Sequence, residues 1–195
     1  DEHDDAPPLP GEAAPQAEGG NPSTAGFARR VLWWSLLINT PAGVSYSAKD
    51  IAGIFLSHLH SDHSFDIAAI LNFSWTMKRV DRVPIYGPQG TVQLAQKAQD
   101  YANETVRVFA KQSLNTGQID FALPQDITGD GVVFSDDRIT VTVAENTHYQ
   151  TFDHSADKSF SYRVECPDRV ICFSGDTGPS EALTRLANGV DVLVS

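Results

Sequence analysis

The sequence predicts one domain of mixed α and β structure, in the α/β or α+β class. The chain has 195 residues, and single domains usually have about 100–200. Hydrophobic residues make up 41% of the chain and charged residues 20%, a composition that is ordinary for a folded globular protein. Segments with the apolar spacing of strands alternate along the chain with segments that have the spacing of helices.

Residues 1–26 differ from the rest of the chain in composition. Pro, Gly, Ala and acidic residues dominate this segment, and Leu9 is its one large apolar residue. A segment with so little apolar surface cannot offset the entropy that ordering costs. We therefore expect a flexible acidic tail over residues 1–26 and the folded domain over residues 27–195.

Apolar spacing places the elements in the first half of the domain. Continuous apolar runs predict strands over residues 31–38 and 51–57. Apolar residues at helical spacing predict a helix over residues 65–77, with Ser64 in position to cap its N-terminus. A short strand over residues 83–86 and a second helix over residues 91–102 follow.

The second half of the chain is predicted to be mostly strands. Residues 104–109 and 132–134 are two strand candidates separated by a loop, and residues 138–145 alternate between apolar and polar side chains. Residues 160–165 and 170–173 have the pattern of a hairpin. A helix over residues 179–187, with Pro at its start and Gly just after its end, precedes a last strand over residues 190–194.

The charge of the chain excludes some partners. It has 14 Lys and Arg against 25 Asp and Glu, a net charge of −11. A protein that grips nucleic acid by charge alone needs clustered Lys and Arg, so we expect no nucleic-acid partner beyond short substrates. The longest apolar run, over residues 31–38, is far shorter than the roughly 20 residues of a membrane helix, so no membrane partner is expected.

The segment from Ser57 to His63 carries the chemistry. His58 and His60 are two positions apart at the end of a predicted strand, where alternate side chains point the same way. Asp62 and His63 follow in the turn before the next helix. Neutral imidazole nitrogens and a carboxylate oxygen are ligands that suit Zn²⁺, and the spacing predicts a zinc site.

This segment resembles the His-x-His-x-Asp-His signature of the metallo-β-lactamase superfamily, with Ser57 where Thr is more familiar. The turn over residues 174–178 resembles the family segment that supplies a bridging aspartate, and residues 146–149 resemble the segment that supplies a third histidine. Residues 86–91 and 131–134 are similar to segments of the ribonuclease Z-like branch. The resemblance implies a four-layer αβ/βα sandwich.

The resemblance also implies a role for each ligand. His58, His60 and His148 would hold one zinc ion, Asp62 and His63 a second, and Asp176 would bridge the two. Asp62 and Asp176 would orient a hydroxide formed from metal-bound water, with Asp62 accepting its proton. His154, six positions after His148, competes for the role of third histidine.

One ligand of the family pattern has no counterpart. Relatives supply a last histidine from a downstream strand end, and the sequence contains no histidine after Asp176. We therefore expect a domain that is truncated at its C-terminus and lacks the family's final strand and helix. A complete site takes two zinc ions, and this chain is expected to hold one or none.

Three functions follow from this pattern. The first is a zinc-dependent hydrolase that cleaves a phosphodiester or related ester in a small substrate. The second is a lactone or β-lactam hydrolase on the same site, and the third is a degenerate metal-binding module without activity. Because relatives with this fold often pair, the resemblance also implies a homodimer.

Two other motifs have simpler interpretations. Residues 126–137 resemble a calcium-binding loop in their spacing of Asp and Gly, but their flanks have the pattern of strands, which favours a turn. Cys166 and Cys172 lie on the two arms of the predicted hairpin, where a staggered register keeps them apart. Both are expected to be buried free thiols.

Overall fold

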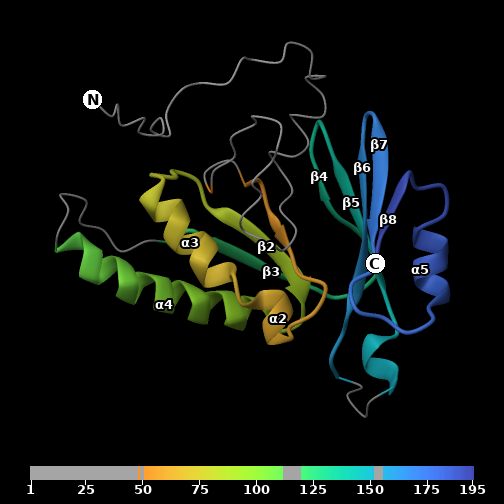
Figure 1. The fold of residues 1–195 in the computed structure, drawn as a ribbon, viewed down its shortest axis with the longest axis horizontal. Helices are drawn as coiled ribbons and strands as arrows, with labels where there is room; N and C mark the ends of the chain where they lie inside the picture. The colour runs from red at the N-terminus through yellow and green to blue at the C-terminus, as the bar shows by residue number, and fades with distance from the viewer. Residues whose placement is uncertain (1–47, 49–50, 112–119, 152–155) are drawn as a thin grey trace, which may run out of the picture.

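The computed structural model describes residues 48, 51–111, 120–151 and 156–195, which form two β-sheets with helices on their outer faces (Figure 1). The predicted tail over residues 1–26 and the predicted strand over residues 31–38 lie outside the described residues. Across the described part of the chain, no helix combines the length and apolar character that crossing a membrane requires.

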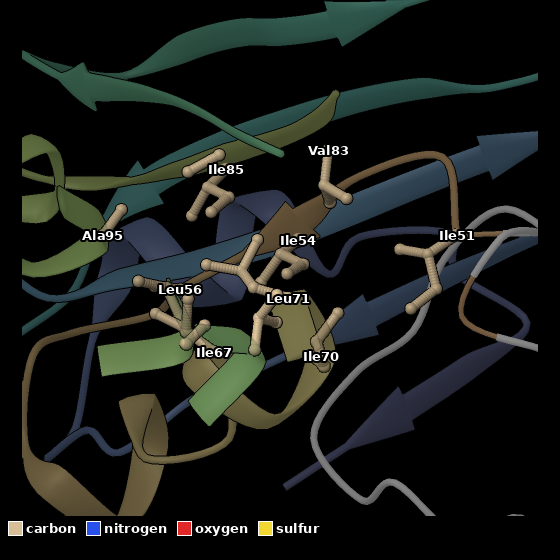
Figure 2. Close-up of a cluster of buried hydrophobic side chains, with 12 residues drawn as sticks. Ile51, Ile54, Leu56, Ile67, Ile70, Leu71, Val83, Ile85 and Ala95 are labelled. Atoms are coloured by element: carbon tan, nitrogen blue, oxygen red, sulfur yellow. The ribbon is translucent and has the colours of Figure 1, made fainter. Parts of the chain in front are cut away.

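The first sheet is parallel and has three strands in the order β1-β2-β3. Its strands are β1 (Ile54–Phe55), β2 (Val83–Pro88) and β3 (Ala122–Ile127). The helices α3 (Ile67–Thr76) and α4 (Thr91–Ala110) pack against each other and cover its outer face. Apolar side chains from the helices and the sheet, including Ile54, Leu71 and Ile85, form the core between them (Figure 2).

The second sheet has five strands in the order β4-β5-β6-β7-β8. Its strands are β4 (Gly131–Ser135), β5 (Thr140–Glu145), β6 (Phe160–Cys166), β7 (Arg169–Phe173) and β8 (Val192–Val194). Neighbours from β4 to β7 are antiparallel, whereas β8 runs parallel to β7 after the crossover helix α5 (Glu181–Leu186). Helix α5 packs on this sheet, so the order of layers is helix, sheet, sheet, helix, as predicted.

A second core joins the two sheets. Phe55 of β1 stacks on Tyr86 of β2, with ring centroids 5.1 Å apart, and meets the edge of Tyr162 from β6. The rest of this core is apolar side chains of the inner faces, such as Ile127 and Val141. Because β1 packs against β6 here, the chain that leaves β1 emerges beside the ends of the second sheet.

The prediction for residues 104–109 was wrong, because these residues form the last turns of α4 rather than a strand. The β-branched residues in this segment suggested a strand, but the buried positions Gln99, Ala102 and Val106 continue one helical stripe. The sequence analysis also missed β3, which holds Pro124 and follows the undescribed residues 112–119. β3 is identified as a strand only by its pairing with β2.

The predicted helix over residues 65–77 starts later than expected. A separate short helix, α2 (Ser61–Ser64), precedes α3, and the residue at the N-cap of α3 is Asp66 rather than Ser64. The Ser64 hydroxyl instead donates to the His60 carbonyl at 2.9 Å. The strand predicted over residues 51–57 is also reduced to β1, because the chain turns away from the sheet to enter the histidine segment.

The two simpler motifs have structural roles. Asp126 caps α4 from the end of β3, accepting the Gly90 N–H at 3.3 Å and the Val92 N–H at 3.0 Å. This agrees with the turn interpretation of residues 126–137. Cys166 lies opposite Arg169 in the β6–β7 hairpin, and both cysteines are free thiols. Cys172 is buried as expected, but Cys166 is partly exposed because it lies beside the turn.

Candidate metal centre

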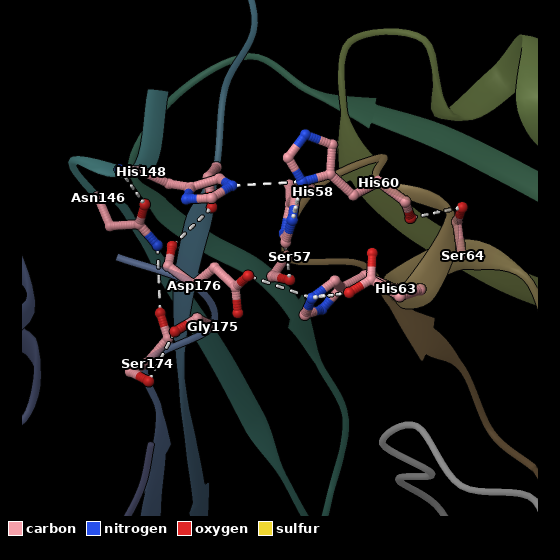
Figure 3. A network of polar contacts seen from close by, with 12 residues as sticks. Ser57, His58, His60, His63, Ser64, Asn146, His148, Ser174, Gly175 and Asp176 are labelled. Carbon is pink, nitrogen blue, oxygen red and sulfur yellow. Dashed lines mark hydrogen bonds and ion pairs between the residues drawn. The ribbon is translucent and has the colours of Figure 1, made fainter. Parts of the chain in front are cut away.

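Four segments bring the predicted ligands to one end of the sandwich, where both sheets finish. His58 and His60 follow β1, and His63 lies in α2. His148 begins the short 3-10 helix η2 (His148–Thr151) after β5, and Asp176 follows β7. Figure 3 shows these side chains pointing toward one another across the gap between the segments. The competing His154 lies outside the described residues.

Three imidazoles form the first ligand group. The Nδ1 atom of His60 lies 3.0 Å from Nε2 of His58 and 3.4 Å from Nε2 of His148. Nitrogen ligands about 2.0–2.1 Å from a tetrahedral zinc ion would be about 3.3 Å apart. This group consists of the three histidines predicted for the first ion. Their nitrogens therefore have the spacing of metal ligands.

His58 is held in the form that a metal requires. Its side chain is fully buried, and Nδ1 lies 3.0 Å from the hydroxyl of Ser57. When Nδ1–H donates to that hydroxyl, the lone pair of Nε2 faces the other histidines. Burial, and then the nearby His63, His148 and His60, together lower the pKa of His58 to about 4 against an opposing effect of Asp176. The imidazole is therefore neutral near pH 7.

The second ligand group is formed by His58, His63 and Asp176. The Nε2 atom of His63 lies 3.4 Å from a carboxylate oxygen of Asp176 and 3.5 Å from one of Asp62. Asp62 stands outside both groups, and its side chain is 72% exposed. The two groups share His58, so the donor atoms form one continuous site.

A glycine allows the two halves of the site to approach. Gly175 has a φ of +58°, a conformation that side chains disfavour. A Cβ atom at this position would lie 2.9 Å from Cβ of Ser57 and 3.2 Å from the Phe160 carbonyl oxygen. The strand end that carries Asp176 can therefore pack directly against the segment that carries His58.

The sequence analysis missed the residues that hold these segments in place. Tyr162 of β6 is fully buried and donates to the Leu56 carbonyl at 2.7 Å, while the Phe160 N–H donates to the Ser57 carbonyl at 2.9 Å. Burial raises the pKa of Tyr162 and keeps its hydroxyl a donor. The partners are more than a hundred residues apart in sequence, so no local pattern predicts the contact.

A cavity of about 450 Å³ lies beside the second ligand group. Its lining includes Asp62, His63 and Asp176 together with apolar side chains such as Phe65 and Phe173. The site thus combines metal-binding donors with adjacent space. The chemistry of the donors suits a divalent metal ion, and the neutral His58 and the spacing of the nitrogens fit one.

The chain is similar to known proteins in sequence and in fold. The family model described as "Beta-lactamase superfamily domain" matches residues 25–195. Ribonuclease Z of Mycolicibacterium gilvum (strain PYR-GCK) is 26% identical over 163 residues, covering 81% of this chain and 54% of the relative. Ribonuclease Z of Mycobacterium sp. (strain KMS) is 29% identical over 164 residues, covering 78% of this chain and 52% of the relative. The chain spans about half the length of these curated relatives.

Two solved structures show the same fold. The short form of human tRNase Z superposes with a TM-score of 0.54 and 19% identity, covering 76% of this chain and 58% of that one. The metallo-beta-lactamase fold protein YhfI from Bacillus subtilis gives a TM-score of 0.53 and 17% identity, covering 76% of this chain and 50% of that one. Both agree with the fold that the sequence analysis expected.

Proposed function

Because the chain belongs to the beta-lactamase superfamily, we propose that it is a zinc-dependent hydrolase that cleaves a phosphodiester or related ester in a small substrate. The observation that carries this proposal is the pair of ligand groups that share the buried, neutral His58. The relatives named ribonuclease Z support a phosphodiester as the bond that is cleaved. The net charge of −11 favours a small substrate over a long nucleic acid.

Zinc at such a site supplies a Lewis acid and lowers the pKa of water. His58, His60 and His148 would hold one ion, because their ring nitrogens lie only 3.0 and 3.4 Å apart. Asp176 belongs to the second group and would orient the attacking water from that side. Asp62, whose side chain is largely exposed, would accept the proton and pass it to solvent.

The stoichiometry that we propose is one firmly bound zinc ion per chain. The second group has His58 in common with the first, so a second ion would have only His63, Asp176 and nearby Asp62 as ligands of its own among the described residues. Zinc content after dialysis, measured by elemental analysis, tests this proposal. Two ions retained per chain would contradict it.

Hydrolysis of bis(p-nitrophenyl) phosphate tests the reaction. The wild-type protein should turn the ester over after zinc is added and stop when a chelator removes the metal. The double variant His58→Ala/His60→Ala should lose both zinc and turnover. His148→Ala should lose them too, whereas the matched variant His154→Ala should keep them. Turnover that survives in the double variant would rule out this site.

Two alternatives use the same ligands. Parallel assays with a lactone and a carbapenem identify a carbonyl hydrolase if either is cleaved faster than the phosphodiester. A protein that binds zinc firmly but cleaves none of the three is the non-catalytic module. The position of Asp62 outside both ligand groups favours this module, because the proposed proton acceptor is then no part of either group.

The expected homodimer stays a prediction. Light scattering coupled to size exclusion measures the mass directly, and a mass near 21.2 kDa, that of one chain, would contradict pairing.

A further inference from the structure

Asn146 lies at the centre of the polar contacts that surround the metal ligands. It follows β5, two positions before His148, and it is only 3% exposed. Its side-chain oxygen accepts the His148 N–H at 3.1 Å. Its side-chain nitrogen donates to the Ser174 carbonyl at 3.1 Å and to the Ser161 hydroxyl at 3.3 Å. One buried carboxamide therefore contacts three different segments. Figure 3 shows its contacts with His148 and Ser174.

Two of these segments carry ligands of different groups. His148 belongs to the first group, and Ser174 stands two positions before Asp176 of the second. The Ser161 hydroxyl donates to the same Ser174 carbonyl at 2.6 Å, so the strand end that leads to Asp176 is held from two directions. The backbone N–H of Asn146 is itself fixed on the Ser159 carbonyl at 2.8 Å.

We propose that Asn146 is a positioning residue that sets the distance between His148 and Asp176, and through it the affinity of the site for metal. The inference rests on metal binding at the proposed site. It adds a residue that contacts neither metal nor substrate and that acts through the two ligand-bearing segments it joins. Such outer partners of metal ligands typically contribute about 10- to 100-fold in metal affinity.

The carboxamide is the group that these contacts require. It supplies two N–H donors and one acceptor in one plane, and the structure uses all three functions. Aspartate at position 146 would keep the acceptor for the His148 N–H but would turn an oxygen toward the Ser174 carbonyl. Alanine would leave the His148 N–H without this acceptor. Both changes should release the two segments from each other.

Gln99 provides a matched control. It is the other carboxamide among the buried polar residues of the described chain, also 3% exposed, and its oxygen accepts the Phe121 and Ala122 N–H groups at 2.9 and 3.0 Å. Ala122 begins β3, which runs parallel to β2 and β1. Gln99 therefore joins α4 to the end of the sheet opposite the metal ligands, and Gln99→Ala should weaken the fold without reaching the site.

The test measures metal binding in the whole chain. Zinc affinity is determined by competition with a chromophoric chelator, and the geometry of the site is read from the visible spectrum of the Co²⁺-substituted protein. Asn146→Ala and Asn146→Asp should lower zinc affinity about 10- to 100-fold and change the Co²⁺ spectrum. Gln99→Ala should leave both as in the wild type, even where it lowers the melting temperature as much.

Two results would overturn the proposal: wild-type affinity and spectrum in Asn146→Ala, or equal changes in Gln99→Ala. If neither variant of Asn146 folds, Ser161→Ala decides, because it removes one of the two donors to Ser174 and should give a smaller loss of affinity. Unchanged binding in Ser161→Ala would then count against the proposal. If the wild-type protein itself binds no zinc, the proposed function is contradicted. The zinc titration of the wild type tests this separately from the Asn146 variants.

Discussion

At the scale of the residue, both ring nitrogens of His58, the central residue of the candidate metal centre, have a polar neighbour. Ser57 faces one ring nitrogen at 3.0 Å, and His60 faces the other at 3.0 Å. Burial makes the protonated ring unfavourable, so the lone pair is available near neutral pH. The same burial makes the stability of the metal-free protein depend on pH.

The pKa of His58 is about 4 in the folded chain and 6.5 as the ordinary value. Between these two pH values the unfolded chain binds more protons than the folded chain. The contribution of His58 to the free energy of unfolding is therefore fully present above pH 6.5 and is lost as the pH drops toward 4. The loss should be on the order of 3 kcal/mol, at about 1.4 kcal/mol per pKa unit. Urea unfolding of the metal-free protein at several pH values measures it. A His58→Asn variant with an unchanged pH slope would contradict this assignment.

Tyr162 anchors the histidine segment from the second sheet, through its hydroxyl bond to the Leu56 carbonyl. Removing this buried donor in Tyr162→Phe should cost about 1–3 kcal/mol of unfolding free energy. Tyr101→Phe is the control, because Tyr101 is 66% exposed, and such surface changes usually stay within about 0.5 kcal/mol. Denaturant midpoints of the two variants measure the difference, and equal midpoints would rule out the anchoring role.

At the scale of the element, the end of β7 and the end of β1 meet through Gly175. The carboxylate of Asp176 reaches the second ligand group because no side chain at position 175 separates its backbone from Ser57. Two effects act at Gly175: the close approach of two segments from different sheets, and the backbone preference of glycine for positive φ. A glycine with positive φ but no close neighbour separates the two effects.

Gly175→Ala and Gly189→Ala make this separation. Both glycines have positive φ, of +58° and +69°, so alanine at either should cost about 1–2 kcal/mol in backbone strain. A Cβ atom at position 189 meets nothing within 4 Å, whereas one at position 175 meets Ser57 at 2.9 Å. Gly175→Ala should therefore cost more in thermal unfolding and also reduce zinc binding. Equal costs and intact zinc binding in both variants would contradict the role of the close approach.

Short-range patterns explain which elements were predicted correctly. Strand β6 alternates between apolar and polar residues along its own sequence. Helix α5 has Ser180 as its cap, with the hydroxyl accepting the Leu183 N–H at 3.2 Å. The end of α4 was mistaken for a strand because a helix propagates through a segment of β-branched residues when one face stays buried. β3 depends on a parallel partner that is distant in sequence, which no local pattern reveals.

At the scale of the whole molecule, the ligand groups join the two sheets. His58, His60 and His63 follow the first sheet, whereas His148 and Asp176 follow strands of the second. An ion held by both sets would bind the folded arrangement and not the unfolded chain. Metal binding should therefore stabilise the whole domain.

Zinc at a free concentration 100-fold above its dissociation constant should raise the free energy of unfolding by about 2.7 kcal/mol. A chelator should reverse the gain, and His58→Ala/His60→Ala should not show it. Urea unfolding with and without zinc measures the effect, and the absence of any zinc-dependent shift in the wild type would contradict binding between the sheets.

The sequence by itself determined the class of fold, the family and the segments that carry the candidate ligands. The spacing of His58, His60, Asp62 and His63 is local, so it is visible in the sequence without the fold, and the family model and the four layers agree with it. Only the tertiary structure decided how these donors group, with His58 shared between two groups and Asp62 left outside both. The physical reason is that Asn146, Tyr162 and Gly175 set the site through contacts between segments far apart in the chain, and such contacts exist only once the two sheets have packed.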